Sequence, residues 1–120
     1  MFKKQQSLAK SFLSAFRGVK HAAEERNFVI QSIIGLAAIS LAFILNLSLT
    51  EKAVVIIFTA LVLVIEIINS AFEKILDKII KEKNPEVARI KELMAAAVFI
   101  FSIAAFFLGL WIFGYAIFFR

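Results

Sequence analysis

The chain has 120 residues, of which 62% are hydrophobic, with one proline, no cysteine and a formal net charge of +5. The lack of cysteine excludes disulfides and thiol metal sites. Because the charges are clustered and the clusters are separated by long apolar runs, the composition argues against a compact soluble domain. The sequence therefore predicts an all-α membrane protein in which residues 1–120 form a single integral membrane domain.

Residues 5–24 predict an amphipathic helix that lies on the membrane surface. Leu8, Phe12, Phe16 and Val19 follow one another at spacings of four, four and three, and the basic side chains of this segment lie off that stripe. This pattern is typical of a helix in the interface between lipid and water.

Three hydrophobic segments are long enough to cross a bilayer. Residues 28–50 carry no charge over 23 positions, and residues 93–119 carry none over 27. Both exceed the roughly 20 residues that span a hydrocarbon core. Residues 53–65 are also uncharged, and their helical pattern continues through Phe72. The predicted spans are residues 28–48, 53–72 and 93–117.

Two polar segments connect the predicted spans. Residues 46–52 suit a tight external turn, because they contain Asn, Ser and Thr. Residues 81–92 form the main polar break, in which Asn84 is the predicted N-cap of the third helix and Pro85 fits its first turn.

The placement of basic residues predicts the orientation of the chain. Twelve of the fourteen lysines and arginines precede the first span or lie between the second and third. Cytoplasmic segments carry an excess of Lys and Arg. We therefore expect a multi-pass protein of the bacterial inner membrane, with a cytoplasmic N-terminus and an external C-terminus. The same distribution accounts for the net charge, so nucleic acid is not an expected partner.

The second span carries polar residues where apolar ones are expected. At about 100° per residue, Glu66, Asn69, Glu73 and Asp77 share a sector of about 80° on one helical face. Holding an ionised carboxylate near hydrocarbon costs roughly 3 kcal/mol even on the mildest scale, so this stripe requires cations, a metal or water as partners. Glu66 lies about 10 Å deeper than Glu73, which makes it the strongest functional candidate.

Charged residues also precede the other two spans. Glu24 or Glu25 could share a divalent cation with Glu73, because hard oxygen ligands suit magnesium that carries phosphates. Lys91 could meet a phosphate charge. Each candidate has an ordinary alternative. Asp77 can simply solvate a helix end, Glu24 can pair along its own helix, and Lys91 can anchor its span.

Two separated blocks, EIINSAFEKILD and ARIKELMAAAV, resemble the prokaryotic diacylglycerol kinase and undecaprenol kinase family. The family signature runs E-x-x-N-[TS]-A-[IF]-E-x-x-x-D and then K-D-x-x-A-A-A-V. A third block, AFRGVKHAAEERNF, looks like the G-x(6)-E-R-N-F stretch of the undecaprenol branch. The resemblance covers residues 15–98. It implies a homotrimeric lipid kinase that uses ATP and Mg²⁺ to phosphorylate a lipid hydroxyl at the cytoplasmic face, with sites shared between protomers.

The resemblance also implies roles for individual residues. Glu66 would be the base that takes the proton from the lipid hydroxyl, and Asn69 would orient the site. Glu25 and Glu73 would hold the metal. The implied nucleotide-binding residues are Lys10, Glu25, Glu73, Asp77, Lys91 and Glu92.

Two positions depart from the family pattern. Glu92 replaces the aspartate of the K-D pair, which leaves its role open. Gln31 stands where many members of the undecaprenol branch carry His, so the stretch that ends in ERNF favours undecaprenol only slightly over diacylglycerol as the acceptor.

Two other classes of function stay open from the residues alone. A small oligomeric ion or proton transporter would use the carboxylate stripe as a relay. That function requires a polar route to the outer side, whereas residues 53–65 contain Thr59 as their one polar side chain. A non-catalytic assembly subunit would use Glu66, Glu73 and Lys91 to bind a partner protein.

Overall fold

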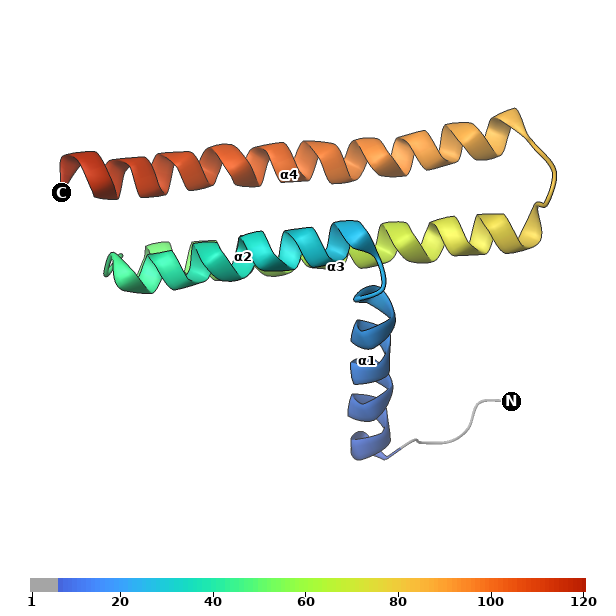
Figure 1. Cartoon of the computed structure of the whole chain (residues 1–120), viewed down its shortest axis with the longest axis horizontal. Helices are drawn as coiled ribbons and strands as arrows, with labels where there is room; N and C mark the ends of the chain where they lie inside the picture. The colour runs from blue at the N-terminus through green and yellow to red at the C-terminus, as the bar shows by residue number, and fades with distance from the viewer. Residues whose placement is uncertain (1–6) are drawn as a thin grey trace.

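A computed structural model describes residues 7–120 of the chain. Its helices are α1 (Leu8–Ala22), α2 (Arg26–Ile44), α3 (Leu49–Ile79) and α4 (Pro85–Phe119). No strand occurs between residues 7 and 120, which confirms the all-α prediction. Figure 1 shows α2, α3 and α4 along the long axis of the molecule, whereas α1 projects crosswise from the beginning of α2. Residues 5 and 6, where the surface helix was predicted to begin, lie outside the described residues.

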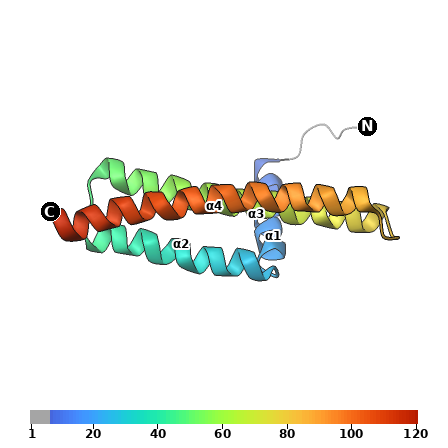
Figure 2. The same ribbon diagram turned by 90° about the horizontal axis from the view of Figure 1, so that it is seen from above.

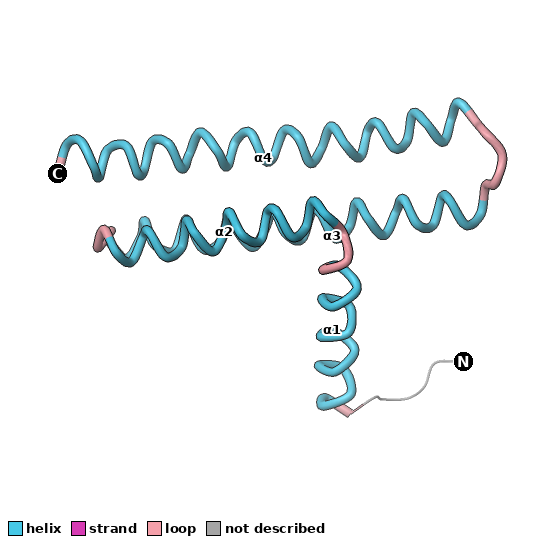
Figure 3. Tube along the Cα trace, viewed as in Figure 1, coloured by secondary structure: helices cyan, strands magenta, loops and turns pink. Residues whose placement is uncertain are grey.

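The connections define two ends of the molecule, which Figure 3 marks by their loops. The turn end holds the α2–α3 turn and the C-terminus, and the loop end holds the α3–α4 loop. Helix α3 has 31 residues and α4 has 35, so they run for roughly 45 and 50–55 Å. Both lengths exceed the roughly 30 Å of a hydrocarbon core. Both helices therefore continue past the predicted spans and extend beyond the start of α2 at the loop end (Figure 1).

The helices begin at polar caps that the sequence supplies. The hydroxyl of Ser7 caps α1, and Ser48 forms a capping box with Glu51 at the start of α3. Asn84 caps α4 with Pro85 as the first helical residue, as the sequence predicted. Such caps satisfy backbone N–H groups that have no partner inside the helix.

The α2–α3 turn is shorter than predicted, because the capping box already starts α3 at residue 49. Asn46 adopts a φ of 56° in this turn, a left-handed conformation that asparagine tolerates better than most residues. The small buried cluster of the protein lies beside the turn and comprises Ala42, Leu47 and Val55. Ile112 and Phe113 of α4 pack against it. Figure 2 shows α4 passing over the α2–α3 pair.

Most large apolar side chains lie on the outside of the helices. Helices α2, α3 and α4 are each long and apolar enough to cross a membrane, and α4 contains no buried residue. Phe99 and Trp111, for example, are exposed. An apolar surface of this extent is unfavourable in water, and it suits helices whose outer faces contact lipid or neighbouring chains.

Helices α2 and α3 approach each other closely at Gly35. A Cβ atom at this position would overlap the methyl group of Thr59. We expect Gly35→Ala to lower the free energy of unfolding by about 1–3 kcal/mol through overpacking, measured as a lower melting temperature in detergent. Gly114→Ala is the matched control, since no heavy atom lies within 4 Å of its new methyl group. If the two variants have equal melting temperatures, the helix contact at Gly35 does not require glycine. If the double variant Gly35→Ala/Thr59→Ala regains the wild-type melting temperature, the overlap with the Thr59 methyl group is the cause of the loss.

Candidate active site

The inner face of α3 carries a buried carboxylate. Glu66 is 5% exposed, and it is the sole charged side chain that is buried among residues 7–120. Val55 and Val62 precede it at spacings of eleven and four residues and are the other buried residues of α3. Because these spacings keep all three on one helical face, Glu66 continues the apolar packing surface of α3 toward the loop end.

Two further carboxylates lie near Glu66. Glu73 follows Glu66 by seven residues on the same face of α3, and Glu25 is the N-cap residue of α2. Like charges at such positions repel one another. Positive charge near these carboxylates would therefore be favourable.

Asn69 lies between Glu66 and Glu73 on the same face of α3, and its amide oxygen has no hydrogen-bond partner within residues 7–120. This oxygen is buried, and a buried acceptor without a donor costs about 1–3 kcal/mol. Asn69 is thus suited to receive a hydrogen bond from a bound molecule that presents a hydroxyl or amino group.

Two ion pairs tie the helices together at the loop end. Lys74 Nζ lies 3.0 Å from Glu25 Oε2 and links α3 to the beginning of α2. Lys91 Nζ lies 2.7 Å from Asp77 Oδ1 and links α4 to α3. The side chain of Asp77 is 65% exposed, unlike the deeper Glu66. The predicted stripe therefore runs from a buried carboxylate to a solvent-accessible one that is paired with a lysine.

Lys10 and Glu92 stand apart from these groups. Lys10 lies in the first turn of α1, and this helix carries it away from α3 (Figure 1). Glu92 is exposed on α4 and takes part in no ion pair within the described part of the chain. Within the single chain, Glu66, Asn69, Glu73 and Asp77 follow one face of α3. Lys91 of α4 pairs with Asp77, and Glu25 at the start of α2 pairs with Lys74. The nucleotide-binding roles of Lys10 and Glu92 stay predictions.

Sequence reasoning missed the pairing of Lys74. In the sequence, Lys74 is one of the basic residues that predict the orientation of the chain in the membrane. The pattern of α3 alone does not reveal its partner on α2. Its position directly after Glu73 was the available signal, because a lysine beside a candidate metal ligand can reach the ligands on a neighbouring helix.

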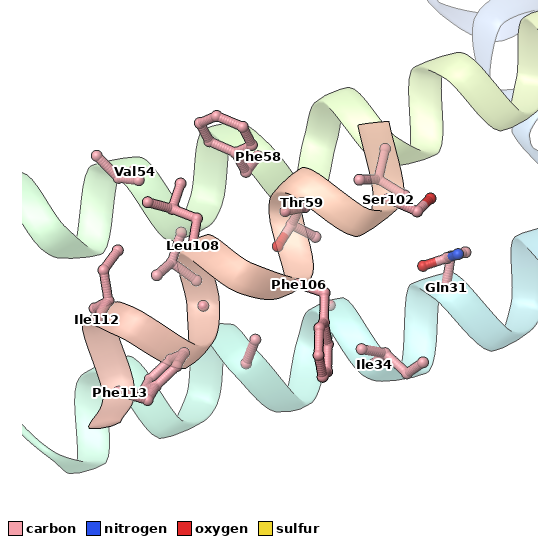
Figure 4. Close-up of a pocket in the computed structure, with 16 residues that line it drawn as sticks. Gln31, Ile34, Val54, Phe58, Thr59, Ser102, Phe106, Leu108, Ile112 and Phe113 are labelled. Atoms are coloured by element: carbon pink, nitrogen blue, oxygen red, sulfur yellow. The ribbon is translucent and has the colours of Figure 1, made fainter. Parts of the chain in front are cut away.

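Figure 4 shows the side chains that line a largely apolar cavity. Its volume is about 280 Å³, and it lies between α2, α3 and α4. Val62, one turn before Glu66 on the same face, lines it. The polar lining side chains are Gln31, Thr59 and Ser102. The buried Oγ of Ser102 has no hydrogen-bond partner within residues 7–120.

These features define a small helical membrane protein in which α3 carries acidic and amide side chains from the edge of an apolar cavity toward the loop end, where lysines pair with carboxylates. The chain belongs to the prokaryotic diacylglycerol kinase family, whose model matches residues 13–113. This match confirms the resemblance that the sequence motifs indicated.

Three relatives illustrate the breadth of the family. The chain is 36% identical over 105 residues to a diacylglycerol kinase of Synechocystis sp., and 35% identical over 89 residues to a diacylglycerol kinase of Pseudomonas aeruginosa. It is 30% identical over 105 residues to an undecaprenol kinase of Bacillus subtilis. The alignments cover 86%, 74% and 87% of this chain. The chain spans 60% of the length of the Synechocystis relative, 68% of the Pseudomonas one and 85% of the Bacillus one.

Proposed function

We propose that the protein transfers the γ-phosphate of ATP to the hydroxyl group of a membrane lipid at the cytoplasmic face of the bacterial inner membrane. The observation that carries this proposal is Glu66, a carboxylate that is 5% exposed in a span-length helix. Its burial requires a function or a partner, and membership of a family named for a lipid kinase supplies the reaction class.

In this mechanism Glu66 is the general base. The proton of the lipid hydroxyl passes to its carboxylate while the hydroxyl oxygen attacks the γ-phosphorus, and the bond from that phosphorus to the β,γ-bridging oxygen breaks so that ADP leaves. A base must lie within hydrogen-bond reach of the proton that it removes. Asn69, one turn away, would orient the substrate by donating an amide N–H to the hydroxyl oxygen, which leaves the hydroxyl proton free for Glu66.

Glu25 and Glu73 are suited to a magnesium ion that arrives with the nucleotide. Mg²⁺ is commonly held by one or two carboxylates, while water and substrate phosphates complete its octahedron. Residues 7–120 contain no group of three or more side chains that would hold a metal by themselves, so the proposed ion depends on water and phosphate oxygens for its other ligands. When bound, the ion neutralises charge on the transferring phosphates. Glu25 must leave Lys74 to take part.

The remaining polar groups would position the nucleotide. Phosphoryl transfer is accelerated mainly by positioning and by neutralisation of charge. Lys91, which Asp77 holds at the loop end, is placed to contact phosphate oxygens. Glu92 and Lys10 complete the proposed nucleotide-binding set, and Lys10 would reach it from α1 of the same or a neighbouring protomer.

Undecaprenol is favoured slightly over diacylglycerol as the acceptor. The ERNF sequence at residues 25–28 supports it. Overall identity does not support this choice, since it is 30% to the Bacillus undecaprenol kinase and 36% and 35% to the two diacylglycerol kinases. Gln31 also argues in the other direction, since it replaces a histidine that is frequent in the undecaprenol branch.

We also propose that the protein is a homotrimer with sites shared between protomers. Helix α4 buries no residue within a single chain, and small residues such as Ala95, Ala96 and Ala97 permit close packing of helices. Neighbouring protomers would screen the carboxylates of α3 from lipid. Mass measurement of the protein in nanodiscs tests this assembly, and a monomeric mass in an active preparation would contradict it.

A lipid-resolved phosphorylation assay tests the proposed function. Purified protein in detergent micelles is given Mg²⁺, radiolabelled ATP, and either undecaprenol or diacylglycerol. We expect labelled lipid phosphate, with faster labelling of undecaprenol. A folded protein that labels neither lipid would refute the kinase assignment, and faster labelling of diacylglycerol would reverse the choice of acceptor.

The apolar cavity is proposed to receive the hydrocarbon part of the lipid next to the hydroxyl. Gly109 lines it, and a Cβ added there would meet no heavy atom within 4 Å. We expect Gly109→Leu to fill part of the cavity and to lower kcat/KM for the long-chain lipid about tenfold, since lost apolar contacts are worth about 1–3 kcal/mol. The KM for ATP should stay unchanged.

Gly114→Leu is the matched control for this substitution. Gly114 is on the same helix and has equally open space around it, but it does not line the cavity. Equal lipid kinetics in the two variants would show that the hydrocarbon chain binds elsewhere.

A further inference from the structure

Lys74 makes a contact that neither the family motif nor the proposed mechanism explains. Its ammonium group lies 3.0 Å from Glu25 Oε2 and joins residues that are 49 positions apart in the chain. Glu25 is the N-cap residue of α2, yet its side chain makes no capping hydrogen bond. Its carboxylate therefore pairs with Lys74 and does not accept hydrogen bonds from the free backbone N–H groups of its own helix.

The lysine ammonium and a divalent cation compete for the same carboxylate. Magnesium requires direct access to carboxylate oxygens, and the proximity of Lys74 Nζ opposes a second positive charge there. Metal binding through Glu25 therefore requires that the ammonium group move away.

The structure permits such a movement. The side chain of Lys74 is 67% exposed and that of Glu25 is 36% exposed. Exposed ion pairs contribute little to stability, and the lysine stem is long and flexible. The ammonium group can leave Glu25 without disturbing packed side chains.

Lys74 remains close to the site after it leaves Glu25. It directly follows Glu73, the second proposed metal ligand. A metal that arrives with ATP also brings phosphate oxygens, which are strong acceptors for an ammonium group. The displaced lysine thus has a new anionic partner within reach.

We propose that Lys74 is the counter-ion of Glu25 in the nucleotide-free protein, and that it exchanges this carboxylate for the nucleotide phosphates when magnesium and ATP bind. This inference rests on the proposed function and adds a nucleotide-binding residue to it. Lys74 then opposes binding of the metal alone and favours binding of the metal together with the nucleotide.

Two binding measurements on Lys74→Met test this exchange. The first follows Mn²⁺ binding to the nucleotide-free protein by electron paramagnetic resonance. The second follows binding of the magnesium complex of a non-hydrolysable ATP analogue by calorimetry. We expect Lys74→Met to bind Mn²⁺ about three- to tenfold more tightly, because a nearby positive charge is gone, and the nucleotide complex about three- to tenfold more weakly.

Lys78→Met is the matched control. Lys78 lies one turn further along α3, is exposed, and takes part in no ion pair within residues 7–120. This variant loses the same charge at the same end of the molecule, and both of its dissociation constants should stay within about twofold of the wild type, because its charge lies farther from the metal. Lys74→Arg keeps the charge and should restore both constants toward wild type.

The opposite signs of the two changes distinguish this exchange from a merely structural role. A structural ion pair would weaken both binding events together and lower the melting temperature. Equal Mn²⁺ affinities in Lys74→Met and Lys78→Met, or a loss of both affinities in Lys74→Met, would overturn the inference. Neither measurement depends on turnover, so failure of the kinase assay in the wild type would refute the proposed function separately.

Discussion

Replacing Glu66 with glutamine is expected to lower the rate of lipid phosphorylation by about 10²–10⁴-fold, the usual contribution of a positioned general base. Glutamine has nearly the same shape but cannot accept the hydroxyl proton. Because Glu66 is buried in α3 and Glu25 and Glu73 remain in place, the variant should fold and bind magnesium and ATP within about twofold of wild type. Radiolabel transfer and nucleotide binding, measured on one preparation, check both expectations.

Glu66→Asp is the control for the Glu66→Gln variant. It keeps a carboxylate but shortens it by one methylene, so the base is present at the wrong distance. We expect intermediate activity, since misplacement of a catalytic group by about 1 Å can cost about 10²-fold. If Glu66→Gln retains wild-type turnover, Glu66 is not the base, and its burial needs another explanation.

Replacing Glu73 with glutamine is expected to raise the magnesium concentration needed for half-maximal activity by at least about tenfold. In the proposed site the ion has two protein carboxylates and otherwise binds water and phosphates. Loss of one of the two removes a large part of the protein contribution, and kcat/KM at low magnesium should fall about 10²-fold. Initial rates at fixed ATP and varied magnesium measure this change, and excess magnesium should restore part of the activity.

Glu82→Gln provides the comparison for Glu73→Gln. Glu82 is exposed in the α3–α4 loop at the same end of the molecule, so its replacement removes the same charge outside the proposed site. Its magnesium dependence should match wild type. An unchanged magnesium dependence in Glu73→Gln would remove this residue from the metal site, and an equal shift in both variants would indicate a general effect of surface charge.

The structure and the family match weigh against the transporter alternative. Toward the turn end from Glu66, the buried positions of α3 are Val62 and Val55. The next ionisable residues in the sequence are Lys52 and Glu51. A proton relay requires polar groups or water along its route. The site is therefore better suited to a reaction at the loop end than to conduction through the membrane.

Local features of the sequence predicted most of the fold. The charge-free runs predicted three helices of membrane-spanning length, and the Asn84–Pro85 pair predicted the start of α4. The spacing of Glu66, Asn69 and Glu73 predicted one helical face. These predictions succeed because hydrophobic length, caps and helical period depend on residues close together in the chain.

The predicted spans describe membrane segments and not whole helices. The expected second span ended at residue 72, whereas α3 continues to Ile79. The polar residues that marked the end of the apolar run do not break a helix, since lysine and glutamate have high helix propensity. Hydrophobicity therefore located the membrane segment, and the helix extends beyond it until the loop before Pro85.

The sequence by itself determined the helices and the polar face of α3, because both follow from the order of neighbouring residues. Only the tertiary structure decided which groups meet. The pairing of Lys74 with Glu25 and of Lys91 with Asp77, like the burial of Glu66, depends on the rotation and antiparallel register of helices that are distant in the chain. Helical period sets which side chains share a face, but packing between helices sets what that face contacts.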